Sequence, residues 1–102
     1  MTATIYRIVT EAEWAAAREA GVFAGSEHDR RDGFIHFSTA EQLRETAEKH
    51  YAGRTGLLLL TVDAAAVAAR LKWEVSRGGA LFPHLYGPLP VTAVRAAEAF
   101  AV

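Results

Sequence analysis

The chain has 102 residues, the usual size of one compact folding unit, so we expect a single domain over residues 1–102. Its 11 basic and 12 acidic residues nearly cancel, which excludes a strongly basic nucleic-acid binder. The lack of cysteine excludes disulfide scaffolds, thiolate nucleophiles and cysteine-bound zinc. The sequence shows no secretion signal, and its longest apolar run, Leu57 to Leu60, is too short to cross a bilayer. We therefore expect a cytoplasmic protein with no membrane partner.

The first third of the chain predicts a strand, a helix and an exposed loop. Thr4 to Val9 is rich in β-forming residues. Thr10 and Glu13 have the spacing of a capping box, and Gly21 would end the helix that they begin. Residues 22–33 are irregular and crowded with charge, which is typical of a loop.

The middle of the chain predicts two strands with a helix between them. Phe34 to Phe37 is a short, mostly apolar run, typical of a buried strand. A second capping box, Ser38 to Glu41, would begin a helix that ends near Tyr51, because apolar residues recur there every four positions. Leu57 to Val62 is the clearest strand of the chain.

The last part of the chain predicts one more helix and three extended segments. Asp63 can cap an alanine-rich helix that ends near Arg70. The extended segments are Lys72 to Val75, Leu81 to Tyr86 and Val91 to Phe100. The last of these also has a composition that suits a helix. We predict a strand, because Pro88 and Pro90 favour an extended backbone just before this segment. This order predicts a small α+β fold with about three helices over a mixed sheet.

Four polar positions interrupt apolar segments, where burial costs free energy unless a partner or a ligand compensates. The first is Arg7 on the opening strand. An edge-strand arginine that reaches water is the favoured interpretation. The alternative is a fork of donors aimed at a carboxylate or a phosphate.

The second position is the junction between a strand and a helix at Gly33 to Thr39. His36 is either a core histidine bonded to a backbone carbonyl or part of a site. Ser38 and Thr39 lie where free amides and the helix dipole favour an anion. Ser38 can cap the helix and contact a ligand at the same time.

The third and fourth positions lie on the late extended segments. Glu74 and Arg77 fall on opposite faces of a strand. The alternation alone does not show whether Glu74 is an exposed surface residue or part of a site. His84 and Tyr86 can share one wall of a cleft, which suits stacking on a planar ring and hydrogen bonding to a ribose or an amide. The alternative is a hydrophobic loop with its polar tips in water.

Other familiar arrangements are set aside. The four histidines, His28, His36, His50 and His84, show no short-range ligand spacing, so we expect no metal. A Ser-His-Asp triad lacks its G-x-S-x-G turn, and neither a P-loop nor a G-x-G-x-x-G motif is present.

Several motifs of the chain are similar to those of one bacterial family. They are Tyr6-Arg7-Ile8, Gly33-Phe34-Ile35-His36-Phe37-Ser38-Thr39, Trp73-Glu74 and Phe82-Pro83-His84-Leu85-Tyr86-Gly87. Over nearly the whole chain they resemble the family called domain of unknown function 952, whose activity is not established. That family resembles in turn the ADP-ribosyltransferase superfamily, a small α+β fold whose split sheet holds nicotinamide dinucleotide (NAD) without a Rossmann motif.

The resemblance implies roles for individual residues. An arginine or histidine on an early strand contacts the nucleotide in that superfamily, which here implies Arg7 or His36. A Ser/Thr segment or a tyrosine supports the nicotinamide ribose, which implies Ser38 to Thr39 or Tyr86. A glutamate on a late strand promotes transfer, which implies Glu74. The chain departs from the pattern because Glu74 is followed by two further site-like residues.

The implied activity is ADP-ribosyl transfer or glycohydrolysis with NAD as substrate and no metal. The candidate catalytic residues are Glu74 and His36, and the candidate ligand-binding residues are Arg7, Ser38, Thr39, Arg77, His84 and Tyr86. The alternatives are a non-catalytic module that binds a nucleotide or a phosphorylated metabolite, and a structural or partner-binding domain. We predict that five of these residues converge on one cleft: His36, Ser38, Glu74, His84 and Tyr86.

Overall fold

Three small sheets form the framework of the molecule. The computed structural model describes residues 3–102, apart from the side chain of Arg77. The first sheet has the order β1-β4-β8, with strands Thr4–Thr10, Leu57–Asp63 and Val94–Phe100. The second pairs β2 (Val22–Phe23) with β7 (Leu89–Pro90), and the third has the order β3-β6-β5, with strands Ile35–His36, Leu81–Leu85 and Leu71–Val75. The prediction of a mixed sheet is wrong, because all strand pairings among the described residues are antiparallel.

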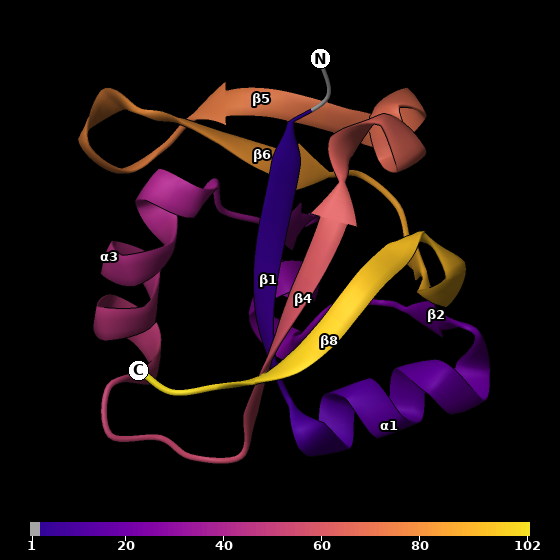
Figure 1. The fold of residues 1–102 in the computed structure, drawn as a ribbon. Coiled ribbons are helices and arrows are strands. Elements are labelled where there is room, and N and C mark those ends of the chain that lie inside the picture. Colours follow the sequence, from indigo (N-terminus) through magenta and orange to yellow (C-terminus); the bar gives the residue numbers. More distant parts are fainter. Residues whose placement is uncertain (1–2) are drawn as a thin grey trace.

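Figure 1 shows how the sheets and helices are arranged. Strands β1, β4 and β8 run side by side, and the β5–β6 hairpin lies across the end of this sheet. Helix α3 (Ala40–Tyr51) and helix α1 (Glu11–Ala20) lie on different sides of the sheet. The chain therefore has two three-stranded sheets that meet, with β1 on one and β3 on the other.

Helix α1 begins and ends as its sequence predicts. The Thr10 hydroxyl accepts a hydrogen bond from the Glu13 amide at 3.0 Å, and the Glu13 carboxylate accepts one from the Thr10 amide at 2.8 Å. Gly21 ends the helix with a positive φ of 86°, a conformation that glycine adopts without steric cost.

The charged segment 22–33 forms an ordered helix, so the prediction of a loop there is wrong. After the short strand β2, helix α2 (Glu27–Asp32) begins at Ser26. The reason is a third capping box, in which Ser26 and Asp29 each accept a hydrogen bond from the backbone amide of the other. The aspartate stands where a capping box usually has Glu or Gln, and Gly33 ends the helix in the left-handed region.

Helix α3 ends at Tyr51 as predicted, but its N-cap is Thr39 and not Ser38. Thr39 and Gln42 form the capping box. Ser38 cannot cap the helix because its backbone pairs with Tyr6 of β1, through hydrogen bonds of 2.8 and 2.9 Å. The helix therefore starts one residue later than predicted, and anion binding at the Ser38–Thr39 junction stays a prediction.

The remaining segments follow the predictions with local differences. Asp63 accepts the Ala65 amide at 3.1 Å, but the segment that it caps, η1 (Ala64–Arg70), is a 3₁₀ helix with a kink at Val67. Turn η2 (Arg77–Gly79) joins β5 to β6. The predicted strand at the C-terminal end is confirmed as β8, after a 3₁₀ turn η3 (Val91–Ala93). Among the described residues, no helix has the length and apolar character needed to span a membrane.

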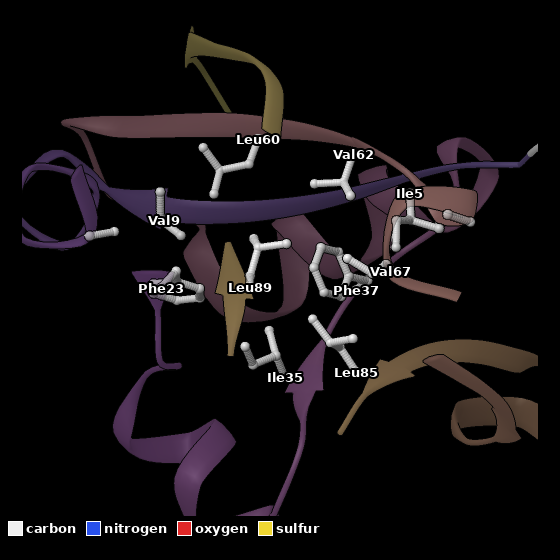
Figure 2. Close-up of a cluster of buried hydrophobic side chains, with 12 residues drawn as sticks. Ile5, Val9, Phe23, Ile35, Phe37, Leu60, Val62, Val67, Leu85 and Leu89 are labelled. Atoms are coloured by element: carbon white, nitrogen blue, oxygen red, sulfur yellow. The ribbon is translucent and has the colours of Figure 1, made fainter. Parts of the chain in front are cut away.

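One apolar cluster joins the sheets. Ile5 and Val62 come from the first sheet, Leu85 and Ile35 from the third, and Leu89 from the second, and Figure 2 shows them packed together. All five are nearly inaccessible to solvent. Because the cluster holds β1 against β3 and β6, the polar residues of these strands come to lie beside one another.

Candidate functional site

Arg7 is a buried arginine with internal partners. Its Nη1 lies 2.7 Å from Oδ1 of Asp29 and also donates to the carbonyl of His36, and its Nε donates to the carbonyl of Ile8. The guanidinium lies 5.3 Å from the ring centroid of Phe23. The interpretation as an edge arginine in water is wrong, because β1 has a neighbour on both of its edges. The donors of Arg7 do meet a carboxylate, but one that belongs to the chain itself.

Asp29 is the residue that organises this region. Its side chain is 2% exposed, and burial alone would raise its pKa. Hydrogen bonds from His36 and Arg7, the positive charge of Arg7 and a hydrogen bond from Ser26 outweigh burial and lower the pKa well below its usual range. Asp29 is therefore ionised at neutral pH.

His36 lies between two carboxylates. Its Nδ1 is 2.6 Å from Oδ1 of Asp29, and its Nε2 is 2.9 Å from Oδ2 of Asp32. The interpretation as a core histidine bonded to a carbonyl is wrong, since one third of the side chain is exposed and both ring nitrogens meet carboxylate oxygens. Asp29 also accepts the backbone amide of His36 at 3.1 Å, which fixes the ring over α2.

His84 stands directly opposite His36 on the neighbouring strand, and the two ring centroids are 5.8 Å apart. Nδ1 of His84 lies 2.8 Å from Oε1 of Glu74, and the hydroxyl of Tyr86 donates to the same oxygen at 2.7 Å. Phe34 stacks on the His84 ring at 4.0 Å. The alternation along β5 and β6 thus brings Glu74, His84 and Tyr86 to one face, as the sequence predicts.

The same contacts shift two further ionisation equilibria. Hydrogen bonds from Tyr86 and His84 lower the pKa of Glu74, which keeps the carboxylate ionised. The hydrogen bond to that carboxylate raises the pKa of Tyr86, so the phenol keeps its proton. Glu74 consequently places a fixed negative charge behind the His84 ring.

A pocket of about 750 Å³ opens beside the two histidines. Residues of β1, α2, β3, α3 and β6 line it, and four of the predicted site residues are among them: Arg7, His36, Ser38 and His84. Glu74 and Tyr86 lie behind His84 and do not line the pocket, so the predicted convergence on one cleft is only partial. Basic and aromatic residues of β1, α3 and the loop after α3 also line the pocket and were not predicted as site residues: Tyr6, Lys49, His50, Tyr51 and Arg54.

The remaining predicted residues have other surroundings. The Ser38 hydroxyl lies 3.0 Å from that of Thr46 on α3, at the pocket wall. Thr39 serves as a helix cap and does not line the pocket. The side chain of Arg77 lies outside the part of the chain that the structure describes.

A second group of side chains joins His36 at the rim of the pocket. Nε2 of His28 lies 3.1 Å from Oδ2 of Asp32, the same oxygen that meets His36. One ligand atom from each of His28, Asp32 and His36 lies within 4.8 Å of the others. This spacing is not apparent when residues 22–33 are taken as a loop, whereas α2 places His28 and Asp32 one turn apart. The signal in the sequence is that Asp32 lies four residues after one histidine, His28, and four residues before another, His36.

Comparisons with known proteins give one family and similar solved structures. The family model described as protein of unknown function (DUF952) matches residues 8–97. The crystal structure of protein CC0527 from Caulobacter crescentus has 49% sequence identity and a TM-score of 0.94, over 97% of this chain and 87% of that one. The solution NMR structure of CC0527 has a TM-score of 0.87, over 97% of this chain and 85% of that one. Among curated proteins, none matches the chain.

Proposed function

Because the chain belongs to the family described as protein of unknown function DUF952, we propose a function from the pocket itself. The pocket binds NAD, and the chain cleaves the bond between its ribose and nicotinamide. The fold would then be a small relative of the ADP-ribosyltransferases, whose ligand lies where two halves of a split sheet meet. The meeting of the β1 and β3 sheets at the pocket supports this proposal.

The size and lining of the pocket support a phosphorylated ligand. Its volume of about 750 Å³ falls within the range of small-molecule sites. Lys49 and Arg54 supply positive charge to the pocket wall, which would suit a pyrophosphate. Tyr6, Tyr51 and Phe82 offer aromatic surface for a base.

The single observation that carries the proposed chemistry is the Glu74–His84–Tyr86 group, of which His84 lines the pocket and the other two lie directly behind it. Cleavage of the glycosidic bond leaves its electron pair on the nicotinamide nitrogen and positive charge on the ribose, and a nearby carboxylate stabilises that charge. Water, or another acceptor, then bonds to the same ribose carbon and loses a proton. The hydrogen bonds from His84 and Tyr86 favour the ionised form of Glu74, and among the described side chains these two contacts both use Oε1. We assign Oε2 to a ribose hydroxyl, which requires the ribose to reach past His84 at the edge of the pocket, with His84 holding the carboxylate in place. His36, on the neighbouring strand β3, contacts the nucleotide.

One observation favours a second candidate function. Glu74 does not line the pocket, and its contacts with His84 and Tyr86 also suit a purely structural role. In that case the chain binds a nucleotide or a phosphorylated metabolite without converting it.

Release of nicotinamide from NAD distinguishes the two candidates. Wild-type protein should release it, and Glu74→Gln should lower the rate by about a hundredfold or more, because the amide keeps the shape and loses the charge. Glu98→Gln, an exposed carboxylate on β8, is the matched control and should keep the wild-type rate. Circular dichroism checks the fold of each variant. Equal rates for wild type and Glu74→Gln would remove Glu74 from the reaction, and saturable binding without release would favour the binding module.

A further inference from the structure

We infer that His28, Asp32 and His36 bind a divalent transition-metal ion. The three residues are spaced four apart in the sequence, and their ligand atoms already lie within 4.8 Å of one another. Two imidazoles and one carboxylate are ligands that zinc and ferrous iron accept. This inference does not depend on the proposed reaction with NAD.

The local fold places the three ligands without strain. His28 and Asp32 lie one turn apart on α2, and the αL glycine that ends this helix, Gly33, returns the chain to β3, where His36 faces them. Zinc ligands at 2.0–2.1 Å in a tetrahedral site lie about 3.3 Å apart. The contacts of Asp32 with His28, 3.1 Å, and with His36, 2.9 Å, are close to that separation.

The contacts of His36 give the main geometric support. Its Nδ1 lies 2.6 Å from Oδ1 of Asp29, and its Nε2 lies 2.9 Å from Oδ2 of Asp32. A neutral imidazole has one N–H and one lone pair, so it can donate to only one of these two carboxylates. A metal ion between Nε2 and Oδ2 of Asp32 would satisfy the second contact while Nδ1–H donates to Asp29.

The surroundings of His36 are those of a metal ligand. Histidines that bind metals commonly donate their other ring N–H to a carboxylate, which fixes the tautomer and makes the ligating nitrogen more basic. Asp29 has this position, and Arg7 and Ser26 hold Asp29 in turn. A surface histidine without such a role would not need a buried carboxylate to orient it.

Three protein ligands leave coordination positions open. His28, Asp32 and His36 all line the pocket, so these positions would face its interior. There they could take oxygen atoms of a ligand or of water. An ion with open positions is typical of catalytic rather than structural metal sites.

The test follows the ring nitrogens of the histidines by NMR while Zn²⁺ is added to the full chain without nucleotide. We expect the Nε2 signals of His28 and His36 to shift, with saturation at one ion per chain. The same titration with Mg²⁺, which prefers oxygen ligands, should leave both signals in place.

Two variants locate the ion. Asp32→Asn should weaken Zn²⁺ affinity at least about tenfold, and His28→Ala should do the same. Glu27→Gln, which removes another exposed carboxylate from α2, is the matched control and should bind as wild type. His28 and Asp32 are both exposed, so these variants should fold.

The inference would be overturned by any of three results. They are unmoved His28 and His36 signals with Zn²⁺, equal shifts with Mg²⁺, and equal Zn²⁺ affinity in Asp32→Asn and Glu27→Gln. None of them bears on nicotinamide release, so the metal site and the proposed reaction fail separately.

Discussion

A single carboxylate, Asp29, links the interior of the molecule to its pocket. It pairs with buried Arg7 on one side, orients His36 on another and caps α2 through Ser26. Removing one partner of a buried ion pair leaves a charge without compensation, which is more costly than the pair is worth.

Asp29→Asn should therefore lower the free energy of unfolding by about 3–5 kcal/mol, because Arg7 would stay buried without an anionic partner. Urea denaturation measures the change. Asp32→Asn, on the exposed end of the same helix, should cost no more than about 0.5 kcal/mol. Equal losses in the two variants would show that the buried pair is not what Asp29 contributes.

The lowered pKa of Asp29 gives a prediction for pH. Its folded-state pKa lies below the unfolded value of about 3.9, so ionised Asp29 stabilises the fold above that value. This contribution is lost as the pH falls from about 5 toward the lowered pKa. The stability gap between wild type and Asp29→Asn should consequently narrow over this range in urea denaturation. A gap that stays constant down to pH 3 would contradict the assignment.

Some residues of the candidate site can be predicted individually from the sequence. His36, His84 and Glu74 could be selected because polar residues inside apolar strands stand out. Asp29 and Asp32 could not, since they lie in a run of charges where any one carboxylate looks like another. What distinguishes these two carboxylates from their neighbours is the residue that each one contacts. Those partners are either distant in the sequence or brought close only when α2 forms.

At the scale of elements, local rules explain most of the fold. The capping spacing at Thr10 and the alternation along β6 predicted a helix start and a shared face correctly. The N-cap of α3 could not be chosen from the sequence, because Ser38 and Thr39 both fit it. The backbone of Ser38 pairs with Tyr6, which is remote in the sequence, and Thr39 is therefore the residue that caps the helix.

The cap assignment makes a prediction that separates the two residues. Thr39→Ala should increase hydrogen exchange at the Gln42 amide and lower the free energy of unfolding by about 1 kcal/mol, because that amide loses the hydroxyl acceptor and keeps only the Thr39 carbonyl. Ser38→Ala should leave exchange at Gln42 unchanged, since its hydroxyl bonds to Thr46. Faster exchange at Gln42 in Ser38→Ala alone would show that Ser38 is the cap.

At the scale of the whole molecule, the arrangement of sheets depends on contacts that no local pattern contains. The order β1-β4-β8 pairs the first strand with one more than forty residues away, and β3 pairs with β6 across a similar distance. Sequence alternation gives strands but not their neighbours, which is why a mixed sheet was expected. The pocket results from this arrangement, because it lies where the two three-stranded sheets meet.

The shared core predicts that the two sheets unfold together. Leu85→Ala on β6 should destabilise the protein by about 2–5 kcal/mol, because it leaves a cavity in the cluster that contains Leu60 and Ile5. Leu81→Ala, on the same strand but 51% exposed, is the control and should cost much less. Thermal unfolding of Leu85→Ala should show one transition, and a second transition would mean that the hairpin unfolds separately.

Binding of NAD in the pocket is the central claim, and an NMR titration of the backbone amides tests it most directly. With millimolar NAD, the amides of Tyr6, Ser38 and His84 should shift and reach saturation, while those of residues 96–98 on the outer strand β8 should not move. A spectrum that does not change at the pocket, or changes equally on β8, would contradict the claim.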